Sequence, residues 1–361
     1  MRRVTVDLGP RAYDVVVGAG SLAEIATVLA GRRRAVIVTQ AALHAHAERA
    51  AAALDAAHIA NTTIVMGDGE EHKTLATVET LAAECVQWGL LRGDAVVAVG
   101  GGIVGDVAGF LAASYHRGIA VVQVPTTLLA MVDASIGGKT GVNLPQGKNL
   151  VGAFHQPLAV LADPTVLETL SDREFRCGLA EVVKYALIGD DDLRVLLSDH
   201  ASELLARDPA IVEAVVARCA AAKARVVEAD ELERTGARAV LNYGHTLAHA
   251  LEIAGGHVLH HGEAVSIGMV FAANLASVLE RVGPEVVEGT EQLLERFGLP
   301  VEAPAGLSGS DVIGLMRRDK KSEGGLTFVL AGPRGVERVD DPDPTAVAKA
   351  LAQVGLTEAV G

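Results

Sequence analysis

The first half of the chain alternates short apolar runs, rich in β-branched residues, with longer alanine-rich segments. Apolar runs of this length that end in Gly, Thr or Pro predict buried strands at 13–20, 34–40, 61–67, 94–102 and 119–127. The segments between them have helical spacing and composition, and they predict helices at 21–30, 41–58 and 74–90. Because strands and helices alternate, we expect an α/β domain with a mostly parallel sheet that is covered on both faces.

The pattern changes after the Asp163-Pro164 turn. From about Asp172 onward, helical spacing dominates, and the predicted helices lie at 172–188, 209–230, 244–255, 262–282 and 285–298. Only residues 324–335 resemble a hairpin. A chain of 361 residues exceeds what one hydrophobic core usually serves. We therefore expect two domains, an α/β domain at 1–168 and a mainly α-helical domain at 169–361.

Composition and charge narrow the possible partners. Half of the residues are hydrophobic, and the formal net charge is −14, so we expect binding neither to nucleic acid nor to an anionic membrane. An anionic ligand would need a concentrated basic pocket. Three widely spaced cysteines support neither a disulfide framework nor a cysteine zinc site. The N-terminal residues lack an apolar signal core and no apolar run is long enough to span a membrane, so we expect a cytoplasmic protein.

A glycine cluster follows the strand predicted at 94–102. Gly100, Gly102 and Gly105 match the G-x-G-x-x-G pattern, in which glycines let a pyrophosphate approach the backbone at the start of a helix. However, no acidic residue lies at the usual distance to bind a ribose. The motif alone therefore leaves two interpretations open, a dinucleotide site or a tight structural turn.

Two further polar segments favour a ligand site. Glu70 and Lys73 follow a predicted strand, at the sheet edge where ligands of open α/β sheets bind. The segment 125–154 then places polar residues among glycines, namely Thr126, Thr127, Asp133, Ser135, Lys139, Lys148 and Asn149. Each residue alone fits loop or capping chemistry. Together they resemble donors that are assembled around an anion.

Histidines gather in the second half, at positions 245, 249, 257, 260 and 261. His245 and His249 are four residues apart and share one helical face, but the glutamate of a zinc-protease helix is missing. A catalytic zinc site takes three N or O ligands and leaves one position open. The spacing does not decide which histidines are ligands, and a carboxylate ligand could come from Glu181 or Glu263. Glu181 and Lys184 also fit an ordinary i, i+3 ion pair.

The motifs in their order resemble the 3-dehydroquinate synthase family of the sugar phosphate cyclase superfamily. The resemblance runs from about Asp68 to Phe328 and rests on "GGGIVGDVAGFLAASYHRG", "VPTTLLAMVDASIGGKTGVN", "GKNLVGAFHQP", "GLAEVVKYALI", "KARVVEADE", "LNYGHTLAHALE", "HHGEAVSIGM" and "DKKSEGGLTFVL". It implies a Rossmann-like sheet followed by a helical domain. Departures from the family pattern are Ala248 for a usual Gly, Gln40 for a usual Asp or Asn, and about one extra residue between Lys223 and Arg238.

The resemblance implies two cofactors and a site residue set. One divalent metal, zinc or cobalt, would be bound by Glu181, His245 and His261. NAD would lie against Glu70, Lys73, Gly100, Gly101, Gly102, Gly105, Asp106, Thr126, Thr127, Asp133, Lys139 and Lys148. The substrate would contact Lys139, Asn149, Lys184, Lys223, Arg238, Asn242, His249 and Lys320, with Arg117 supplied by the other subunit of a homodimer. The residues implied in catalysis are Asp133, Lys139, Lys184, Asn242 and His249.

The implied reaction belongs to the shikimate pathway of aromatic amino acid biosynthesis. A lyase of this family converts 3-deoxy-D-arabino-heptulosonate 7-phosphate to 3-dehydroquinate and phosphate, through transient oxidation by NAD, phosphate elimination, reduction and intramolecular aldol closure. The cluster of lysines and arginines suits this polyanionic substrate. Three alternatives remain, namely another sugar phosphate cyclase, a metal-dependent alcohol dehydrogenase of related architecture, and a non-catalytic metal- or nucleotide-binding protein. A cleft between the two domains is also expected.

Overall fold

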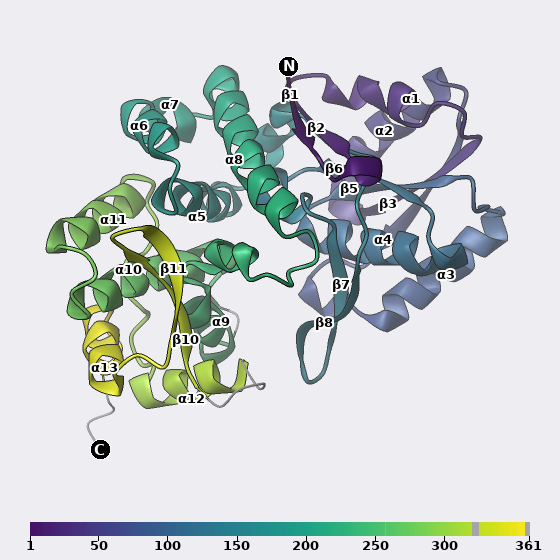
Figure 1. Ribbon diagram of the computed structural model, residues 1–361. Coiled ribbons are helices and arrows are strands. Elements are labelled where there is room, and N and C mark those ends of the chain that lie inside the picture. Colours follow the sequence, from purple (N-terminus) through teal and green to yellow (C-terminus); the bar gives the residue numbers. More distant parts are fainter. Residues whose placement is uncertain (257, 320–324, 358–361) are drawn as a thin grey trace. The chain divides into compact units, whose positions relative to one another are not determined.

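The computed structural model describes residues 1–256, 258–319 and 325–357, and residue contacts divide the chain into two compact units (Figure 1). The first unit comprises Met1–Leu170 and Arg207–Leu232, and the second comprises Ser171–Ala206 and Glu233–Gly361. The sequence-based boundary at 168 remains a prediction. The contacts place residues 169–170 in the first unit, and they also assign to it residues 207–232, which we expected in the helical domain.

A seven-stranded sheet forms the centre of the first unit, in the order β1-β2-β9-β6-β5-β3-β4. All neighbours pair in parallel except β1 and β2. The strands are β1 Arg2–Val6, β2 Tyr13–Val17, β3 Arg34–Gln40, β4 Ala60–Met66, β5 Ala95–Gly100, β6 Ala120–Pro125 and β9 Ala159–Ala162. The predicted mostly parallel sheet is confirmed, whereas β1 and the four-residue β9 were not predicted.

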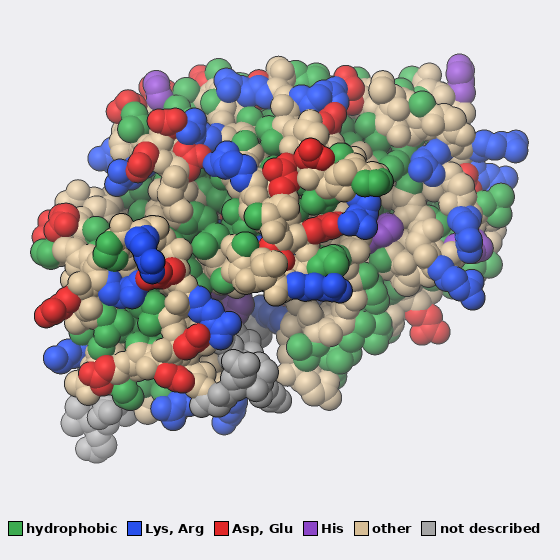
Figure 2. Space-filling view, viewed as in Figure 1, with side chains coloured by type: hydrophobic (Ala, Val, Ile, Leu, Met, Phe, Trp, Pro, Cys, Tyr) green, Lys and Arg blue, Asp and Glu red, His purple; other side chains and the backbone are tan. Residues whose placement is uncertain are grey.

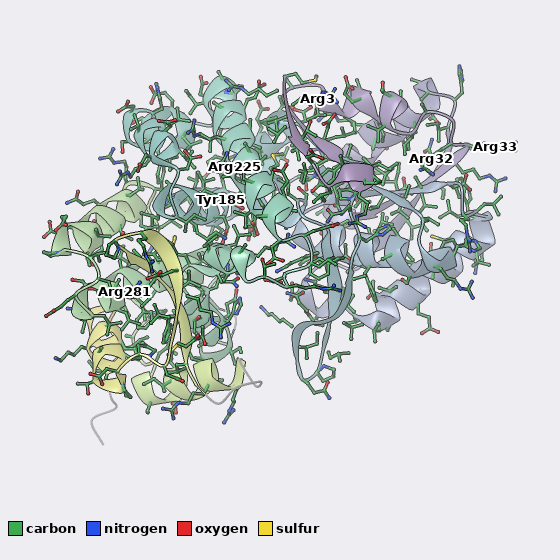
Figure 3. The ribbon with its side chains drawn as sticks, viewed as in Figure 1. Arg3, Arg32, Arg33, Tyr185, Arg225 and Arg281 are labelled. Atoms are coloured by element: carbon green, nitrogen blue, oxygen red, sulfur yellow. The ribbon has the colours of Figure 1, made fainter. Side chains whose placement is uncertain are left out.

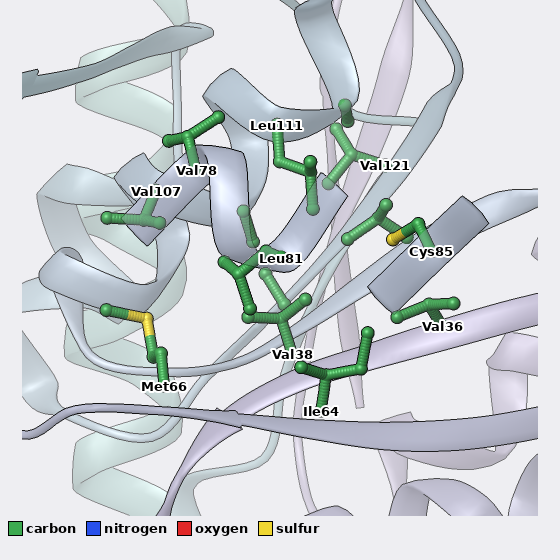
Figure 4. Close-up of a cluster of buried hydrophobic side chains, with 14 of the residues drawn as sticks. Val36, Val38, Ile64, Met66, Val78, Leu81, Cys85, Val107, Leu111 and Val121 are labelled. Carbon is green, nitrogen blue, oxygen red and sulfur yellow. The ribbon is translucent and has the colours of Figure 1, made fainter. Parts of the chain in front are cut away.

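Helices cover both faces of this sheet. They are α1 Ile25–Val28, α2 His44–Ala56, α3 Leu75–Trp88, α4 Gly102–Ser114 and α8 Pro209–Ala229. Strand alternation explains the two layers of the core, since Val36 and Val38 of β3 pack with residues of α3 and α4 (Figure 4), while Ile37 packs on the opposite side with residues of α1 and α2.

Helix α8 packs against β1 and β2 of the first unit. Its start is well defined, because the Asp208 side chain accepts hydrogen bonds from the backbone of Ala210 and Ile211 and Pro209 occupies the first helical turn. Near its end, Glu228 accepts a hydrogen bond of 2.8 Å from the backbone N–H of Asp7. The packing on β1 and β2 and the hydrogen bond between Glu228 and Asp7 attach the helix to the antiparallel edge of the sheet.

The segment that follows β6 contains regular structure that the sequence did not predict. A short π-helix covers Ala130–Ala134, and a hairpin follows with β7 at Lys139–Leu144 and β8 at Gly147–Phe154. Short 3-10 helices occur at Gly9–Arg11, Ser21–Glu24, Ala41–Leu43, Glu70–His72, Tyr115–Arg117, Pro164–Thr169 and Ala237–Asn242. The last of these belongs to the second unit.

The second unit is mainly helical, as predicted. Its helices are α5 Asp172–Leu187, α6 Asp191–Asp199, α7 Ala201–Leu205, α9 His245–Ala254, α10 His261–Val278, α11 Pro284–Arg296, α12 Gly309–Asp319 and α13 Pro344–Gln353. The predicted hairpin is present as β10 Thr327–Gly332 and β11 Gly335–Asp340. Arg281, labelled in Figure 3, forms an ion pair with Glu337 and donates to the carbonyl oxygen of Ala331, and so ties this hairpin to the end of α10.

Helix α10 is the central helix of the second unit, since almost every residue from Gly262 to Ala276 is buried. An apolar surface on all sides is what a helix enclosed by other helices requires. Among the helices that the structure describes, none is both long and apolar enough to cross a bilayer. On the face that Figure 2 presents, acidic and basic side chains are interspersed.

Candidate functional site

Helix α5 carries a buried ion pair in the second unit. Glu181 and Lys184 are 0% and 1% exposed, respectively, and the Lys184 ammonium pairs with Oε2 of Glu181. Lys184 also lies 5.4 Å from the ring centroid of Tyr185, which Figure 3 labels. The i, i+3 pair anticipated from the sequence is therefore present, but it is fully buried. Because burying charge is costly, so complete a burial points to a role beyond that of a surface ion pair.

Two histidines face the other oxygen of Glu181. Its Oε1 lies 3.5 Å from Nε2 of His245, the first residue of α9, and 3.6 Å from Nε2 of His261, the first residue of α10. The donor atoms of the three residues all lie within 4.8 Å of one another. Three helices thus bring together one carboxylate and two imidazoles, which is a suitable donor set for a divalent ion.

The remaining nitrogens of the two imidazoles also have partners. Nδ1 of His245 lies 3.1 Å from the carbonyl oxygen of Tyr243, and Nδ1 of His261 lies 2.9 Å from Oε1 of Glu252. A histidine that donates through one nitrogen presents the lone pair of the other nitrogen, as metal-binding histidines usually do. In both residues, therefore, Nε2 is the atom available to an ion beside Glu181. The residues present fit a metal site.

The two histidines of the donor group differ in their pKa values. Burial, aided by the charge of Lys184, lowers the pKa of His245 to about 3. Burial also lowers the pKa of His261, but hydrogen bonds to Glu181 and Glu252 outweigh it and raise the pKa to about 9. In the metal-free site at neutral pH, His245 is thus neutral and His261 is protonated.

The start of α10 is held against α5 by a defined set of contacts. Glu263 accepts from the backbone N–H of His260 at 2.9 Å, which caps the helix, and receives two hydrogen bonds of 2.7 Å from Arg173. These hydrogen bonds lower the pKa of Glu263. At Gly262 a Cβ atom would lie 2.2 Å from the carbonyl oxygen of Cys177, so only glycine permits this approach. Of the two carboxylates left open by the sequence, Glu181 thus lies in the donor group, and Glu263 anchors the helix.

The other histidines of the cluster lie outside the donor group of described residues. The ring of His249 is half-buried, and its centroid is 5.7 Å from that of His245. His260 pairs with Glu174 at 2.6 Å. His257 and the predicted substrate residue Lys320 lie outside the described residues. Arg238 is 1% exposed, and Asn242 is exposed at the end of a 3-10 helix.

In the first unit, the glycine cluster joins β5 to α4. A Cβ atom at Gly100 would lie 2.5 Å from the Val104 side chain, so packing requires glycine there, whereas a Cβ atom at Gly105 would meet the end of the Gln123 side chain at 2.9 Å. Gly101 differs, because its Cβ would meet only the Thr127 side chain, at 3.2 Å or more. At Gly102 a Cβ would likewise meet only Ala134, at 3.3 Å. Packing therefore accounts for part of the glycine cluster without a ligand, and it does so least at Gly101 and Gly102.

A polar network around the buried Lys73 lies next to this turn. Nζ of Lys73, a residue only 5% exposed, is 2.5 Å from Oδ2 of Asp106 and 2.6 Å from Oδ1 of Asn149. Asn143, which the sequence did not single out, donates to Glu70 at 2.7 Å and accepts from the backbone N–H of Asn149 at 2.8 Å. Burial raises the pKa of Asp106, and the charge of Lys73 opposes this rise.

The remaining predicted residues of the first unit lie on α8, directly after β6, on the β7–β8 hairpin or on the turn after α4. Nζ of Lys223 on α8 lies 2.5 Å from the carbonyl oxygen and 2.8 Å from Oδ1 of Asp133. Thr126 is buried directly after β6, and Oγ1 of Thr127 accepts from the backbone of Ala130 at 3.1 Å. Exposed positions on the hairpin or on the turn after α4 are occupied by Lys139, Lys148 and Arg117. The last of these has a φ of 66°, within a turn of three consecutive positive φ values.

Comparison with known proteins agrees with this fold and site. A solved structure of 2-deoxy-scyllo-inosose synthase with carbaglucose-6-phosphate, NAD+ and Co2+ superimposes with a TM-score of 0.89 at 27% identity, covering 98% of this chain and 100% of that one. The class is therefore that of the sugar phosphate cyclases. Residues 63–177 match the model of the 3-dehydroquinate synthase N-terminal region, and residues 178–322 match that of its C-terminal region. The chain belongs to the 3-dehydroquinate synthase family.

Two relatives illustrate the range of names at this similarity. The 3-dehydroquinate synthase of Symbiobacterium thermophilum is 47% identical over 345 residues, which are 94% of this chain and 96% of the relative. A protein of Amycolatopsis mediterranei is 45% identical over 367 residues, 99% of this chain and 98% of its own, and carries a provisional name as an aminodehydroquinate synthase. The family resemblance inferred from the motifs is confirmed.

Proposed function

We propose that the chain is an NAD- and divalent-metal-dependent 3-dehydroquinate synthase. It converts 3-deoxy-D-arabino-heptulosonate 7-phosphate to 3-dehydroquinate and phosphate, as a lyase that recycles its NAD within each turnover. The observation that carries the proposal is the convergence of Glu181, His245 and His261 in a chain of this family. NAD+ and Co2+ in the related cyclase structure support the two cofactors.

Glu181, His245 and His261 would hold the ion, either zinc or cobalt. Two imidazoles and a carboxylate form a zinc donor set that leaves a position open for substrate. When bound, the ion supplies Lewis acidity that lowers the pKa of a coordinated substrate hydroxyl. The contribution of the chain is to orient both imidazoles through Tyr243 and Glu252 and to keep the Glu181 carboxylate buried beside Lys184.

The cofactor residues proposed for NAD lie on the first unit. They are Glu70, Lys73, Gly100, Gly101, Gly102, Gly105, Asp106, Thr126, Thr127, Asp133, Lys139 and Lys148. NAD supplies a reversible hydride acceptor. Lys73, fixed by Asp106 and Asn149, and the N-terminus of α4 present positive charge and N–H donors, which suit a pyrophosphate.

The substrate residues supply cations and hydrogen-bond donors to a small molecule with a phosphate and a carboxylate. We assign Lys139, Asn149, Lys184, Lys223, Arg238, Asn242, His249 and Lys320 to this role. Asp133, Lys139, Lys184, Asn242 and His249 are the catalytic candidates. Arg117 would reach the substrate of the partner subunit in a homodimer, and its exposure on a tight turn is compatible with this assignment. We further propose a cytoplasmic location.

The Amycolatopsis relative favours a second candidate, a cyclase of the same chemistry acting on an amino analogue of the substrate. A phosphate-release assay on the purified chain tests both, with each sugar phosphate supplied separately, with and without chelator and NAD+. We expect phosphate and 3-dehydroquinate from the heptulosonate, loss of activity with chelator, and no net NADH. Turnover of the amino analogue alone would favour the second candidate. Stoichiometric NADH would indicate a dehydrogenase, and binding of zinc and NAD without phosphate release would indicate a non-catalytic protein.

A further inference from the structure

Glu252 is a buried carboxylate that the assigned site residues do not include. It is 6% exposed and lies on α9, seven residues after His245, so the two side chains share one face of the helix. The next residue, Ile253, is 54% exposed. A carboxylate loses much solvation when it is buried, and it is retained inside a protein only where a partner compensates it.

That partner is an imidazole of the donor group. Oε1 of Glu252 lies 2.9 Å from Nδ1 of His261, while Nε2 of the same ring lies 3.6 Å from Oε1 of Glu181. The imidazole is thus held between two carboxylates, one at each nitrogen. With Glu252 accepting the Nδ1 hydrogen, Nε2 is directed towards Glu181 and His245, and its lone pair would face an ion bound there once the Nε2 proton has left.

The second histidine has a weaker partner. Nδ1 of His245 lies 3.1 Å from the neutral carbonyl oxygen of Tyr243. The charges of Glu181 and Lys184 cancel within their ion pair, so this pair leaves no net negative charge for a divalent cation. Glu252 adds a full negative charge one imidazole away from the ion. A carboxylate bound to a ligating histidine fixes the ring and increases its basicity.

We propose that Glu252 is a positioning residue for the metal, which fixes the orientation and tautomer of His261 and supplies negative charge to the site. The inference rests on the proposed function, because it presupposes that Glu181, His245 and His261 bind an ion. Glu252 itself touches neither the ion nor the substrate in this assignment. Its effect is exerted through His261.

Two substitutions separate orientation from charge. Glu252→Gln retains a hydrogen-bond acceptor of the same shape but removes the charge, whereas Glu252→Ala removes both. Zinc affinity of the full chain is measured by competition with a chromophoric chelator. Since loss of such a partner typically weakens metal binding 10- to 100-fold, we expect about tenfold for Gln and about 100-fold for Ala.

The chain provides a matched control. Glu174 pairs with Nδ1 of His260 at 2.6 Å, but His260 is not in the donor group of described residues. Glu174→Gln therefore removes the charge from a neighbouring carboxylate–histidine pair, and we expect zinc affinity within about threefold of the original chain. In the Co2+-loaded chain, the Glu252 variants should also shift the visible d–d absorption bands, and Glu174→Gln should not. Thermal unfolding of each metal-free variant checks that it is folded.

The outcomes separate this inference from the proposed function. If the unsubstituted chain binds no zinc, both the metal site and the positioning role are wrong. If it binds one zinc tightly and the folded Glu252 variants bind equally well, only the positioning role is wrong. Equal weakening by Glu174→Gln would also overturn the role, because it would indicate general loosening of the start of α10.

Discussion

Nζ of Lys73 lies 2.5 Å from Oδ2 of Asp106, although the lysine is only 5% exposed. The same ammonium donates to Asn149 on the hairpin at 2.6 Å. One buried cation thus connects the segment after β4, the first turns of α4 and the strand β8. In the proposed enzyme, the arrangement of these three segments at the cofactor-binding edge therefore depends on the Lys73 side chain.

Replacing Lys73 by Met should destabilise the first unit. The variant leaves the Asp106 carboxylate, which is 22% exposed, without its cation, and breaking a largely buried pair in this way costs up to about 3 kcal/mol. Urea unfolding of the metal-free chain measures the loss. A second change, Asp106→Asn, removes the carboxylate charge that has lost its partner. It should restore roughly half of the lost free energy of unfolding. If the double variant is as unstable as the sum of the two single variants, the two side chains are not coupled.

Metal binding should strengthen with increasing pH. Hydrogen bonds to Glu181 and Glu252 outweigh burial and raise the pKa of His261 to about 9 in the metal-free site, so an ion must displace a proton there below that pH. His245, with a pKa lowered to about 3, contributes no further proton near neutrality. Zinc affinity should therefore rise about tenfold per pH unit between roughly pH 6.5 and 8.5 and level off above 9. Competition titrations with a chelator of known proton affinity measure the slope.

If the zinc affinity did not change with pH, His261 would not be protonated in the metal-free chain. If the affinity rose about 100-fold per pH unit, two protons would be displaced, and His245 would also be charged in the metal-free chain. Glu181→Gln serves as the companion variant. It removes a ligand and should weaken zinc binding at every pH.

The sequence predicted best those elements whose pattern depends only on their own residues. β5 is an uninterrupted apolar run, as a buried parallel strand requires, β6 departs from such a run only at Gln123, and α10 is a long helical pattern. The hairpin β7–β8 was missed because polar and glycine residues interrupt its alternation. Gly152 is required there by a close approach to the backbone of Thr140, which is a contact between strands and leaves no local pattern.

The candidate site could be predicted only in part, because it also depends on contacts between segments that are distant in the sequence. Helical spacing indicates that His245 and His249 share a face, but it cannot indicate that Glu181 on α5 lies beside His245. The family resemblance supplied that assignment. The spacing did contain one unused signal, because Glu252 follows His245 by two helical turns. Asn143 carried no signal of its own, since its contacts with Glu70 and Asn149 depend on the fold of the hairpin.

Gly101→Ala separates a cofactor site from a structural turn. Gly101 has a φ of −75°, which alanine adopts readily, and its Cβ would meet only Thr127. The free energy of unfolding should change by no more than about 1 kcal/mol. NAD affinity should fall at least about tenfold if a pyrophosphate lies against the backbone at this position. Calorimetric titration with NAD+ and urea unfolding of the same samples measure both quantities.

Gly100→Ala is the structural counterpart of that experiment. Its Cβ would lie 2.5 Å from Val104, so we expect a loss of about 1–3 kcal/mol in stability. A Gly101→Ala chain that binds NAD+ as tightly as the original would contradict the placement of a pyrophosphate against the backbone of Gly101.

Mixing two inactive variants tests whether Arg117 acts across a homodimer. Arg117→Ala and His249→Ala should each abolish most of the phosphate release. In a mixed dimer, the subunit with intact His249 would receive Arg117 from its partner, so one of the two sites is complete. Random re-association of equal amounts makes about half of the dimers mixed, and activity should return to about a quarter of the original. Refolding each variant alone provides the baseline. If the mixture remains as inactive as its components while size-exclusion chromatography shows dimers, Arg117 serves its own subunit.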